Sequence, residues 1–287
     1  MLLSFLVGKK SGINNIKNNM MKKLGMSILR KLRLIKLADK IRFYILFIKT
    51  FKSRRDFKRI NPDVKLPPAF YLYETFNIDY NSYHIKSIDT AKWLSSLFSK
   101  YKSLENLKVL DWGCGPGRVI RHLPNFMGES CQFYGTDYNK KYIKWCRKNI
   151  TNVTFSFNQL YPPLPFENKT FDIIYGISIF THLSLKMHFE WFNELMRILK
   201  PNGIILITLQ SNAFIDKLTS EEKVIYEKGD LVVRSRTKEG HRTFSAFQPT
   251  IFVEKMLGAN KILDHIEGKK VDNKPQQDVW IIQKLSN

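Results

Sequence analysis

The sequence predicts an α/β fold in which an open parallel sheet is covered by helices on both faces. Strand-like and helix-like segments alternate from about residue 85, with short connections between them. In addition, a glycine-rich turn at 113–117 directly follows a short apolar strand. Doubly wound sheets of this kind bind ligands beyond the carboxyl ends of their strands. We therefore expect the functional site at that edge of the sheet.

Each element of this fold follows from a local pattern. Short apolar runs predict strands at 108–110, 132–136, 153–157, 171–177 and 204–209. Apolar residues at helical spacing predict helices at 118–126, 140–149 and 185–199. The tail predicts a hairpin within 231–247, a helix at 249–257, and two closing strands at 262–267 and 279–285.

The positive charge is concentrated at the N-terminus. The 287 residues carry a net charge of +22, and the first 60 hold 17 Lys and Arg against two Asp. Apolar residues recur near helical spacing between 28 and 48, which predicts an amphipathic helical arm over 1–60. Prolines at 62, 67 and 68 then break the helix. We divide the chain into this arm, a linker or lid segment at 61–84, and a main domain at 85–287.

Composition favours a reducing compartment. The three cysteines are too few and too scattered for a disulfide framework or a zinc site, so no metal is expected. No segment has the roughly 20 consecutive apolar residues that a transmembrane span needs. The apolar run at 2–7 lacks the flanking features of a signal peptide. We expect a cytoplasmic protein, either free or peripheral to a membrane.

The decisive motif is Asp111-Trp112-Gly113-Cys114-Gly115-Pro116-Gly117. Glycine permits a tight turn and leaves the backbone open to close approach by a ligand. The helix expected after the turn points free N–H groups at an anion. The spacing G-x-G-x-G differs from the G-x-G-x-x-G of dinucleotide sites. Asp137 lies 20 residues after Gly117 at the end of the second strand, where an acidic side chain holds ribose hydroxyls.

This motif, Asp137, the run 171–175 and the turn 199–203 together resemble the class I methyltransferases that use S-adenosylmethionine (SAM). The resemblance covers about residues 85–287. It implies SAM as cofactor and a seven-stranded, Rossmann-like sheet in the order 3-2-1-4-5-7-6, with strand seven antiparallel. It also implies a cofactor site formed by Asp111, Gly113, Cys114, Gly115, Gly117, Asp137, Tyr138, Asn158, Gln159, Leu160 and Ser178.

Two of these residues need comment. Many relatives carry Asp where this chain has Asn158, but an Asn oxygen can still accept a hydrogen bond from the adenine amine. Tyr138 has two interpretations, because its ring either stacks on the adenine or belongs to the core.

The segments 178–183 and 276–279 are similar to methyltransferases that accompany sugar and polysaccharide biosynthesis. This similarity implies a small-molecule or glycan acceptor. His182 follows strand four and has two interpretations. It is either a general base that deprotonates an acceptor hydroxyl, or a histidine that packs beside the cofactor.

The acceptor pocket is expected beneath two segments. The first lies around Tyr80, Tyr83 and His84, and the second is the insert 210–247. Four basic residues of that insert are candidates for reading an acidic or phosphorylated sugar, namely Arg234, Arg236, His241 and Arg242.

The arm leaves the partners open. It can lie on an anionic membrane, bind nucleic acid, or serve only solubility. Its regular Ile and Leu stripe favours lipid or a protein partner over nucleic acid. O-methylation of a small molecule or glycan is therefore weighed against an RNA or protein methyltransferase guided by the arm, and against a non-catalytic SAM-binding or membrane-associated scaffold. The sequence predicts no particular oligomeric state.

Overall fold

The structure is a computed structural model that describes residues 35–235 and 237–286. The chain divides into two compact units, one ending at Arg55 and one formed by Asp56–Asn287. The first unit contains helix α2 (Ile35–Lys49) and the beginning of α3 (Phe51–Ile60). The predicted arm helix starts at residue 28, so its part at 28–34 lies outside the described residues.

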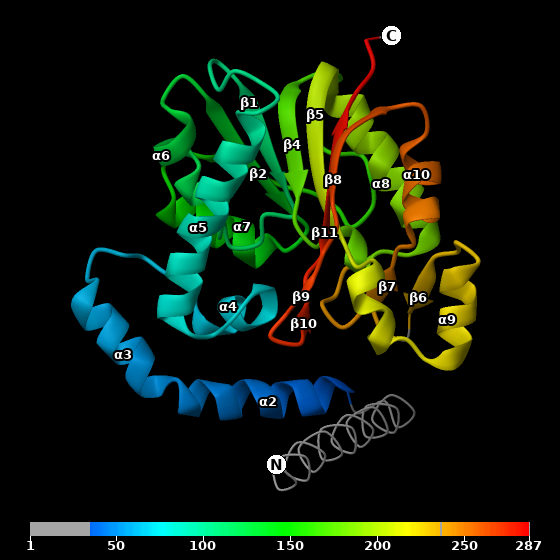
Figure 1. The fold of residues 1–287 in the computed structure, drawn as a ribbon. Helices are drawn as coiled ribbons and strands as arrows, with labels where there is room; N and C mark the ends of the chain where they lie inside the picture. The colour runs from blue at the N-terminus through cyan, green and yellow to red at the C-terminus, as the bar shows by residue number, and fades with distance from the viewer. Residues whose placement is uncertain (1–34, 236, 287) are drawn as a thin grey trace, which may run out of the picture. The chain divides into compact units, whose positions relative to one another are not determined.

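The second unit is built on a seven-stranded sheet (Figure 1). Its strands are β1 (Lys108–Trp112), β2 (Gln132–Asp137), β3 (Thr154–Phe157), β4 (Phe171–Gly176), β5 (Leu199–Leu209), β8 (Lys261–Ile266) and β11 (Asp278–Gln283). Their order is β3-β2-β1-β4-β5-β11-β8, and β11 runs antiparallel to both of its neighbours. This confirms the predicted fold class and the predicted strand order.

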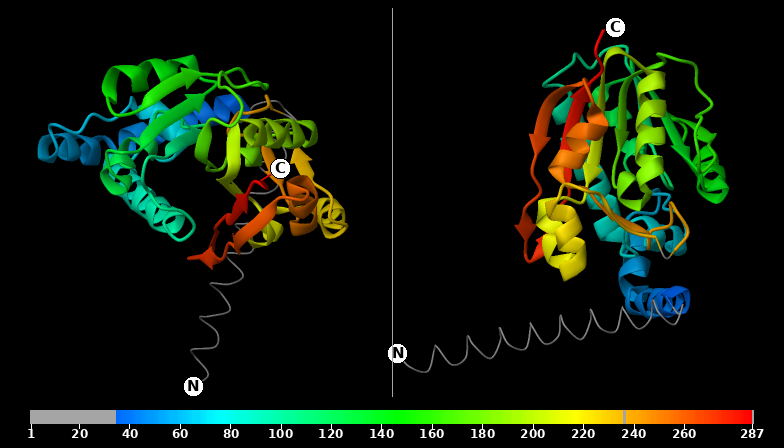
Figure 2. Two further views of the ribbon diagram at one scale, coloured as in Figure 1. Left: turned by 90° about the horizontal axis from the view of Figure 1, so that it is seen from above. Right: turned by 90° about the vertical axis from the view of Figure 1, so that its right-hand side faces the viewer.

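Side chains alternate across the strands and build one core on each face of the sheet. Val109 of β1 and Ile204 of β5 join the first core, and the adjacent Leu110 and Ile205 join the second. The first core is covered by α5 (Tyr80–Phe98), α6 (Pro124–Met127) and α7 (Lys140–Asn149). The second is covered by α8 (Leu185–Ile198) and α10 (Thr250–Leu257). Figures 1 and 2 show these helices on both sides of the sheet.

The helix predicted at 118–126 is wrong. This stretch forms a 3₁₀ turn, η1 (Ile120–His122), followed by the one-turn helix α6. The reason is Pro124, which has no N–H to donate and whose ring clashes with the carbonyl four residues earlier in a continuous helix. Within residues 113–127, the glycine turn therefore leads into no long helix, and the expected helix N-terminus for an anion is missing.

Several short helices and strands lie outside the seven-stranded sheet. Helix α4 (Ala69–Thr75) precedes α5, and η2 (Phe180–His182) follows β4. The insert contains η3 (Asn212–Lys217), α9 (Ser220–Glu227), and the antiparallel strands β6 (Val232–Arg234) and β7 (Ser245–Phe247). This pair confirms the predicted hairpin. Strands β9 (Lys270–Val271) and β10 (Lys274–Pro275) form a second small hairpin. Among the residues that the structure describes, no helix has the length and apolar character needed to cross a membrane.

Candidate functional site

A cleft of about 610 Å³ lies at the carboxyl ends of β1, β2 and β4, where the sheet topology predicts a site. A smaller apolar cavity continues from it toward the end of β3. Two segments from outside the sheet contribute to the lining of the cleft, the end of α4 and the loop at 239–244. All the predicted site residues except Gly117 line one of these two spaces.

The glycine turn shapes the floor of the cleft. Gly113 has a φ of +76°, and a Cβ added there would lie 2.2 Å from Ile179 Cδ1. Any side chain at this position would therefore be strained and would collide with the segment after β4. Gly117 also has a positive φ, of +70°, but it faces a different neighbour. Its Cβ would lie 2.6 Å from Ile150 Cδ1, so packing beneath the turn requires glycine there.

Asp137 is held firmly at the end of β2. Its Oδ2 accepts from the backbone N–H of Gly115 at 2.9 Å, and its Oδ1 accepts from that of Asn139 at 2.7 Å. Burial raises the pKa of Asp137 to about 6, although these two hydrogen bonds oppose the rise. Each carboxylate oxygen keeps a further lone pair. The geometry suits a ligand that offers neighbouring hydroxyl groups.

A second buried carboxyl lies in the same cleft beside a guanidinium group. Burial raises the pKa of Asp111 to about 7, and the positive charge of Arg118 acts in the opposite direction. Arg118 also lines the cleft, with its guanidinium carbon 4.6 Å from the centre of the Phe76 ring. The sequence analysis missed Arg118, although a basic residue directly after the glycine turn was a visible signal. The positive charge of Arg118 therefore lies in the cleft where the N-terminus of a helix was expected to attract an anion.

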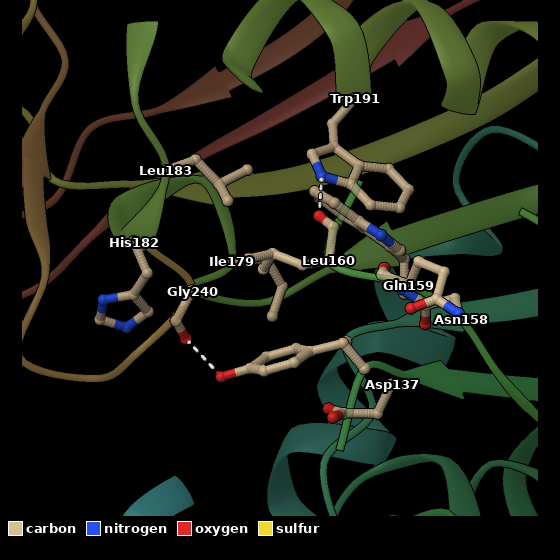
Figure 3. Close-up of a pocket in the computed structure, with 12 residues that line it drawn as sticks. Asp137, Asn158, Gln159, Leu160, Ile179, His182, Leu183, Trp191 and Gly240 are labelled. Atoms are coloured by element: carbon tan, nitrogen blue, oxygen red, sulfur yellow. Dashed lines mark hydrogen bonds between the residues drawn. The ribbon is translucent and has the colours of Figure 1, made fainter. Parts of the chain in front are cut away.

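The smaller cavity has the chemistry of a base-binding pocket. Its lining is mostly apolar and includes Tyr138, Leu160, Ile179, Leu183 and Trp191. Figure 3 shows Trp191 on one side of the cavity, Asp137 on the other, and His182 at the end away from Asn158.

One buried acceptor in this cavity has no partner. The Asn158 side chain donates to Gln159 O at 2.6 Å, while its Oδ1 is buried and accepts no hydrogen bond. A buried acceptor left unpaired costs roughly 1–3 kcal/mol. An aromatic ligand with an amine group could satisfy it. Together with Asp137, this oxygen gives acceptors for the amine and the ribose hydroxyls of the adenosine part of SAM, so the residues present fit the implied cofactor.

His182 is fixed in one tautomer. Its Nδ1 lies 2.7 Å from the backbone oxygen of Phe244, and a carbonyl can only accept, so Nδ1 carries the proton. The Nε2 lone pair is then available to a ligand. Burial lowers the pKa of His182 below its usual value, which keeps the ring neutral near physiological pH. His182 lines both the cleft and the smaller cavity.

Hydrogen bonds hold the loop at 239–244 against the residues of the site. Gly240 N donates to His182 O at 2.9 Å, and Gly240 O accepts from the Tyr138 hydroxyl at 2.9 Å (Figure 3). The Ser184 N–H donates to Glu239 Oε1 at 2.5 Å. The same loop brings His241 and Arg242 to the cleft.

The other candidates for the acceptor wall lie elsewhere. Arg234 forms an ion pair with Glu222 at 2.5 Å, within the insert and outside the cleft lining. Arg236 lies outside the described residues. Tyr80 and Tyr83 are buried in a core cluster, so they do not roof the cleft. Glu74, Thr75 and Phe76 at the end of α4 line the cleft there instead, and no sequence motif marks them.

A polar network behind the cleft was also missed. Thr208 Oγ1 donates to Gln277 Oε1 at 2.6 Å, and Gln277 Nε2 donates to Ser178 Oγ at 2.7 Å. Ser178 has a φ of +64°, and its N–H donates to Thr208 Oγ1 at 2.8 Å. The network therefore holds Ser178 in a left-handed conformation and places Gln277 in the cleft wall.

Comparison with known proteins assigns the region that carries this site. Residues 109–203 match the family model described as a methyltransferase domain. That span contains the glycine turn, Asp137, Asn158 and His182.

Two curated relatives illustrate the range of the similarity. The chain is 29% identical over 133 residues to sterol 24-C-methyltransferase from Schizosaccharomyces pombe, a match that covers 43% of this chain and 34% of that protein. It is 26% identical over 191 residues to malonyl-[acyl-carrier protein] O-methyltransferase from Bacillus anthracis, covering 62% of this chain and 65% of that protein. The match thus spans about a third of the length of the first relative.

Solved structures share the fold. A SAM-dependent methyltransferase from Methanosarcina mazei superposes with a TM-score of 0.52 at 20% identity, over 67% of this chain and 98% of that chain. At this identity the likeness establishes the architecture, and the chemistry has to be argued from the residues.

Proposed function

We propose that this chain is a SAM-dependent methyltransferase and that it methylates a hydroxyl group of a small molecule or glycan intermediate. When bound, SAM supplies a methyl group activated by a positive sulfonium. The chain has to hold the cofactor, align the acceptor behind the methyl group, and exclude water. Asp137 and Asn158 would hold the adenosine part, and Asp111 and Arg118 carry charges opposite to those of the methionine part.

The choice of a hydroxyl acceptor rests on one observation. His182 Nδ1 makes a 2.7 Å hydrogen bond to the backbone oxygen of Phe244. It directs the basic Nε2 of a neutral imidazole to the ligand side. A hydroxyl has to lose its proton as it gains the methyl group, and Nε2 can accept that proton. The lowered pKa of His182 keeps the base available at neutral pH.

The acceptor side of the cleft favours a negatively charged molecule. Arg242 and His241 line the cleft on the loop that also holds His182. A guanidinium group binds carboxylate or phosphate oxygens through paired hydrogen bonds. We therefore place an acidic or phosphorylated sugar first among the candidate acceptors. The malonyl-carrier O-methyltransferase among the relatives offers a parallel, in that its name specifies an acidic acyl group.

The first experiment is isothermal titration of the full chain with SAM and with its demethylated product. Methyl transfer is then measured with radiolabelled SAM on nucleotide sugars and sugar lipids. His182→Asn keeps an N–H that can donate to Phe244 O but removes the base. We expect its turnover to fall about 10²- to 10⁴-fold while its affinity for SAM stays within about twofold. His84→Asn lies outside the cleft and serves as the matched control.

Each result has a clear meaning. Unchanged turnover in His182→Asn would show that His182 only packs beside the cofactor. A folded chain that binds neither SAM nor its product would contradict methyl transfer and favour a membrane-associated scaffold. Labelling of RNA or protein, with sugars left unlabelled, would assign the acceptor to the competing class.

A further inference from the structure

Helix α2 carries a continuous apolar face that is open to solvent. Leu37, Ile41, Tyr44, Ile45 and Ile48 are spaced by three and four residues, so they lie along one side of the helix. Their exposed fractions range from 48% to 73%. Single exposed apolar residues are ordinary on protein surfaces, but a contiguous row of this size marks a contact surface.

Positive charge borders this face. Residues 35–55 contain seven Lys and Arg against one Asp, a net charge of +6. Helical spacing places Lys40 along one border of the apolar face, and Arg42 and Lys49 along the other. All three are exposed. An apolar stripe flanked by Lys and Arg is the pattern of a helix that lies in the interface of a membrane.

We propose that α2 docks on an anionic lipid bilayer, with Leu37, Ile41, Tyr44, Ile45 and Ile48 inserted among the acyl chains and the basic residues against the headgroups. Lys40, Arg42 and Lys49 border the apolar face of α2, and a helix placed across the bilayer would bury these charges among the acyl chains. The helix therefore lies along the surface. This role is separate from methyl transfer and brings the chain to lipid-borne molecules.

Other occupants fit the face less well. Nucleic acid binding depends on cations that meet phosphates and leaves five large apolar side chains without a function. A second copy of the chain would bring two faces of charge +6 together, and like charges oppose that contact. Of these three occupants, an anionic bilayer is the one that complements both the apolar and the basic parts of the face.

The test is co-sedimentation of the full chain with vesicles of phosphatidylcholine alone or of phosphatidylcholine and phosphatidylglycerol in equal parts. We expect the partition coefficient to be at least about tenfold higher on the anionic vesicles. The double variant Ile41→Asp, Ile48→Asp should lose this binding. Ile251→Asp is the matched control, because Ile251 is 64% exposed on α10 and should leave binding unchanged.

Titration with SAM on the same variants separates this proposal from the proposed function. Normal SAM affinity with no vesicle binding in the unaltered chain would overturn the membrane proposal alone. Equal binding to neutral and anionic vesicles, or full binding by the double variant, would overturn it as well. Binding to RNA that the double variant retains would assign the charge to nucleic acid.

Discussion

The two walls of the cleft are built in different ways. The wall assigned to the cofactor consists of residues at or directly after strand ends, such as Gly113, Asp137 and Asn158. The opposite wall is assembled from α4 and the loop at 239–244, which are far apart in the sequence. These two segments meet where the Arg242 guanidinium carbon lies 4.3 Å from the centre of the Tyr73 ring.

The difference shows how each wall is stabilised. Backbone hydrogen bonds fix the first wall, as when Gly115 and Asn139 donate to Asp137. The second wall depends on side-chain contacts and on the hydrogen bonds of Gly240. If the walls serve different ligands, a substitution in one should change the affinity for its own ligand and spare the other.

The largest effect on binding is expected from Asp137→Ala. This variant removes the acceptor for the ribose hydroxyls and leaves the N–H groups of Gly115 and Asn139 unpaired. We expect the dissociation constant for SAM to rise about 100-fold, since hydrogen bonds to a charged group contribute roughly 1.5–3 kcal/mol each. Isothermal titration measures it, with the exposed Asp230→Ala as control. If Asp137→Ala raised only the KM for the acceptor, the assignment of the two walls to different ligands would be wrong.

Arg242→Ala should act on the opposite wall. Removing the guanidinium should raise the KM for an acidic acceptor about tenfold and leave the dissociation constant for SAM unchanged. Arg234→Ala is the matched control, because Arg234 pairs with Glu222 away from the cleft. Steady-state kinetics at saturating SAM measure both variants. Equal effects of the two substitutions would show that Arg242 does not read the acceptor.

An effect of about the same size is expected in the response of SAM binding to pH. The pKa of Asp137 is raised to about 6, so the carboxylate becomes protonated as the pH falls through that value. Only the ionised form offers all its lone pairs to the ribose. Between pH 7.5 and pH 5 the affinity should therefore fall about tenfold. Titration over this range measures it, and Asp137→Asn should flatten the profile. A profile that stays steep in this variant would point to Asp111.

The sequence was most informative where function follows from local geometry. The glycine turn and Asp137 were identified because a strand end fixes both the position and the direction of the next few residues. The strand order was also predictable once the motif had been matched to a family.

Elsewhere the sequence was less informative for physical reasons. Pro124 was visible, but apolar periodicity outweighed it and led to a continuous helix that does not form. Glu74 and Gln277 reach the cleft only through tertiary packing, which leaves no periodic signal. Arg234 and Arg242 look alike in the sequence, but Arg234 pairs with Glu222 outside the cleft lining, whereas Arg242 lines the cleft.

The two backbone hydrogen bonds of Gly240 couple the loop at 239–244 to the site. The Gly240 N–H holds the backbone of His182, and its carbonyl oxygen holds the Tyr138 hydroxyl beside the smaller cavity. Opening the cavity by moving this loop therefore also displaces the proposed base. Departure of the spent cofactor and resetting of the base then become one event. We expect any movement of this loop to shift His182 and the Tyr138 hydroxyl together, because both are hydrogen-bonded to Gly240.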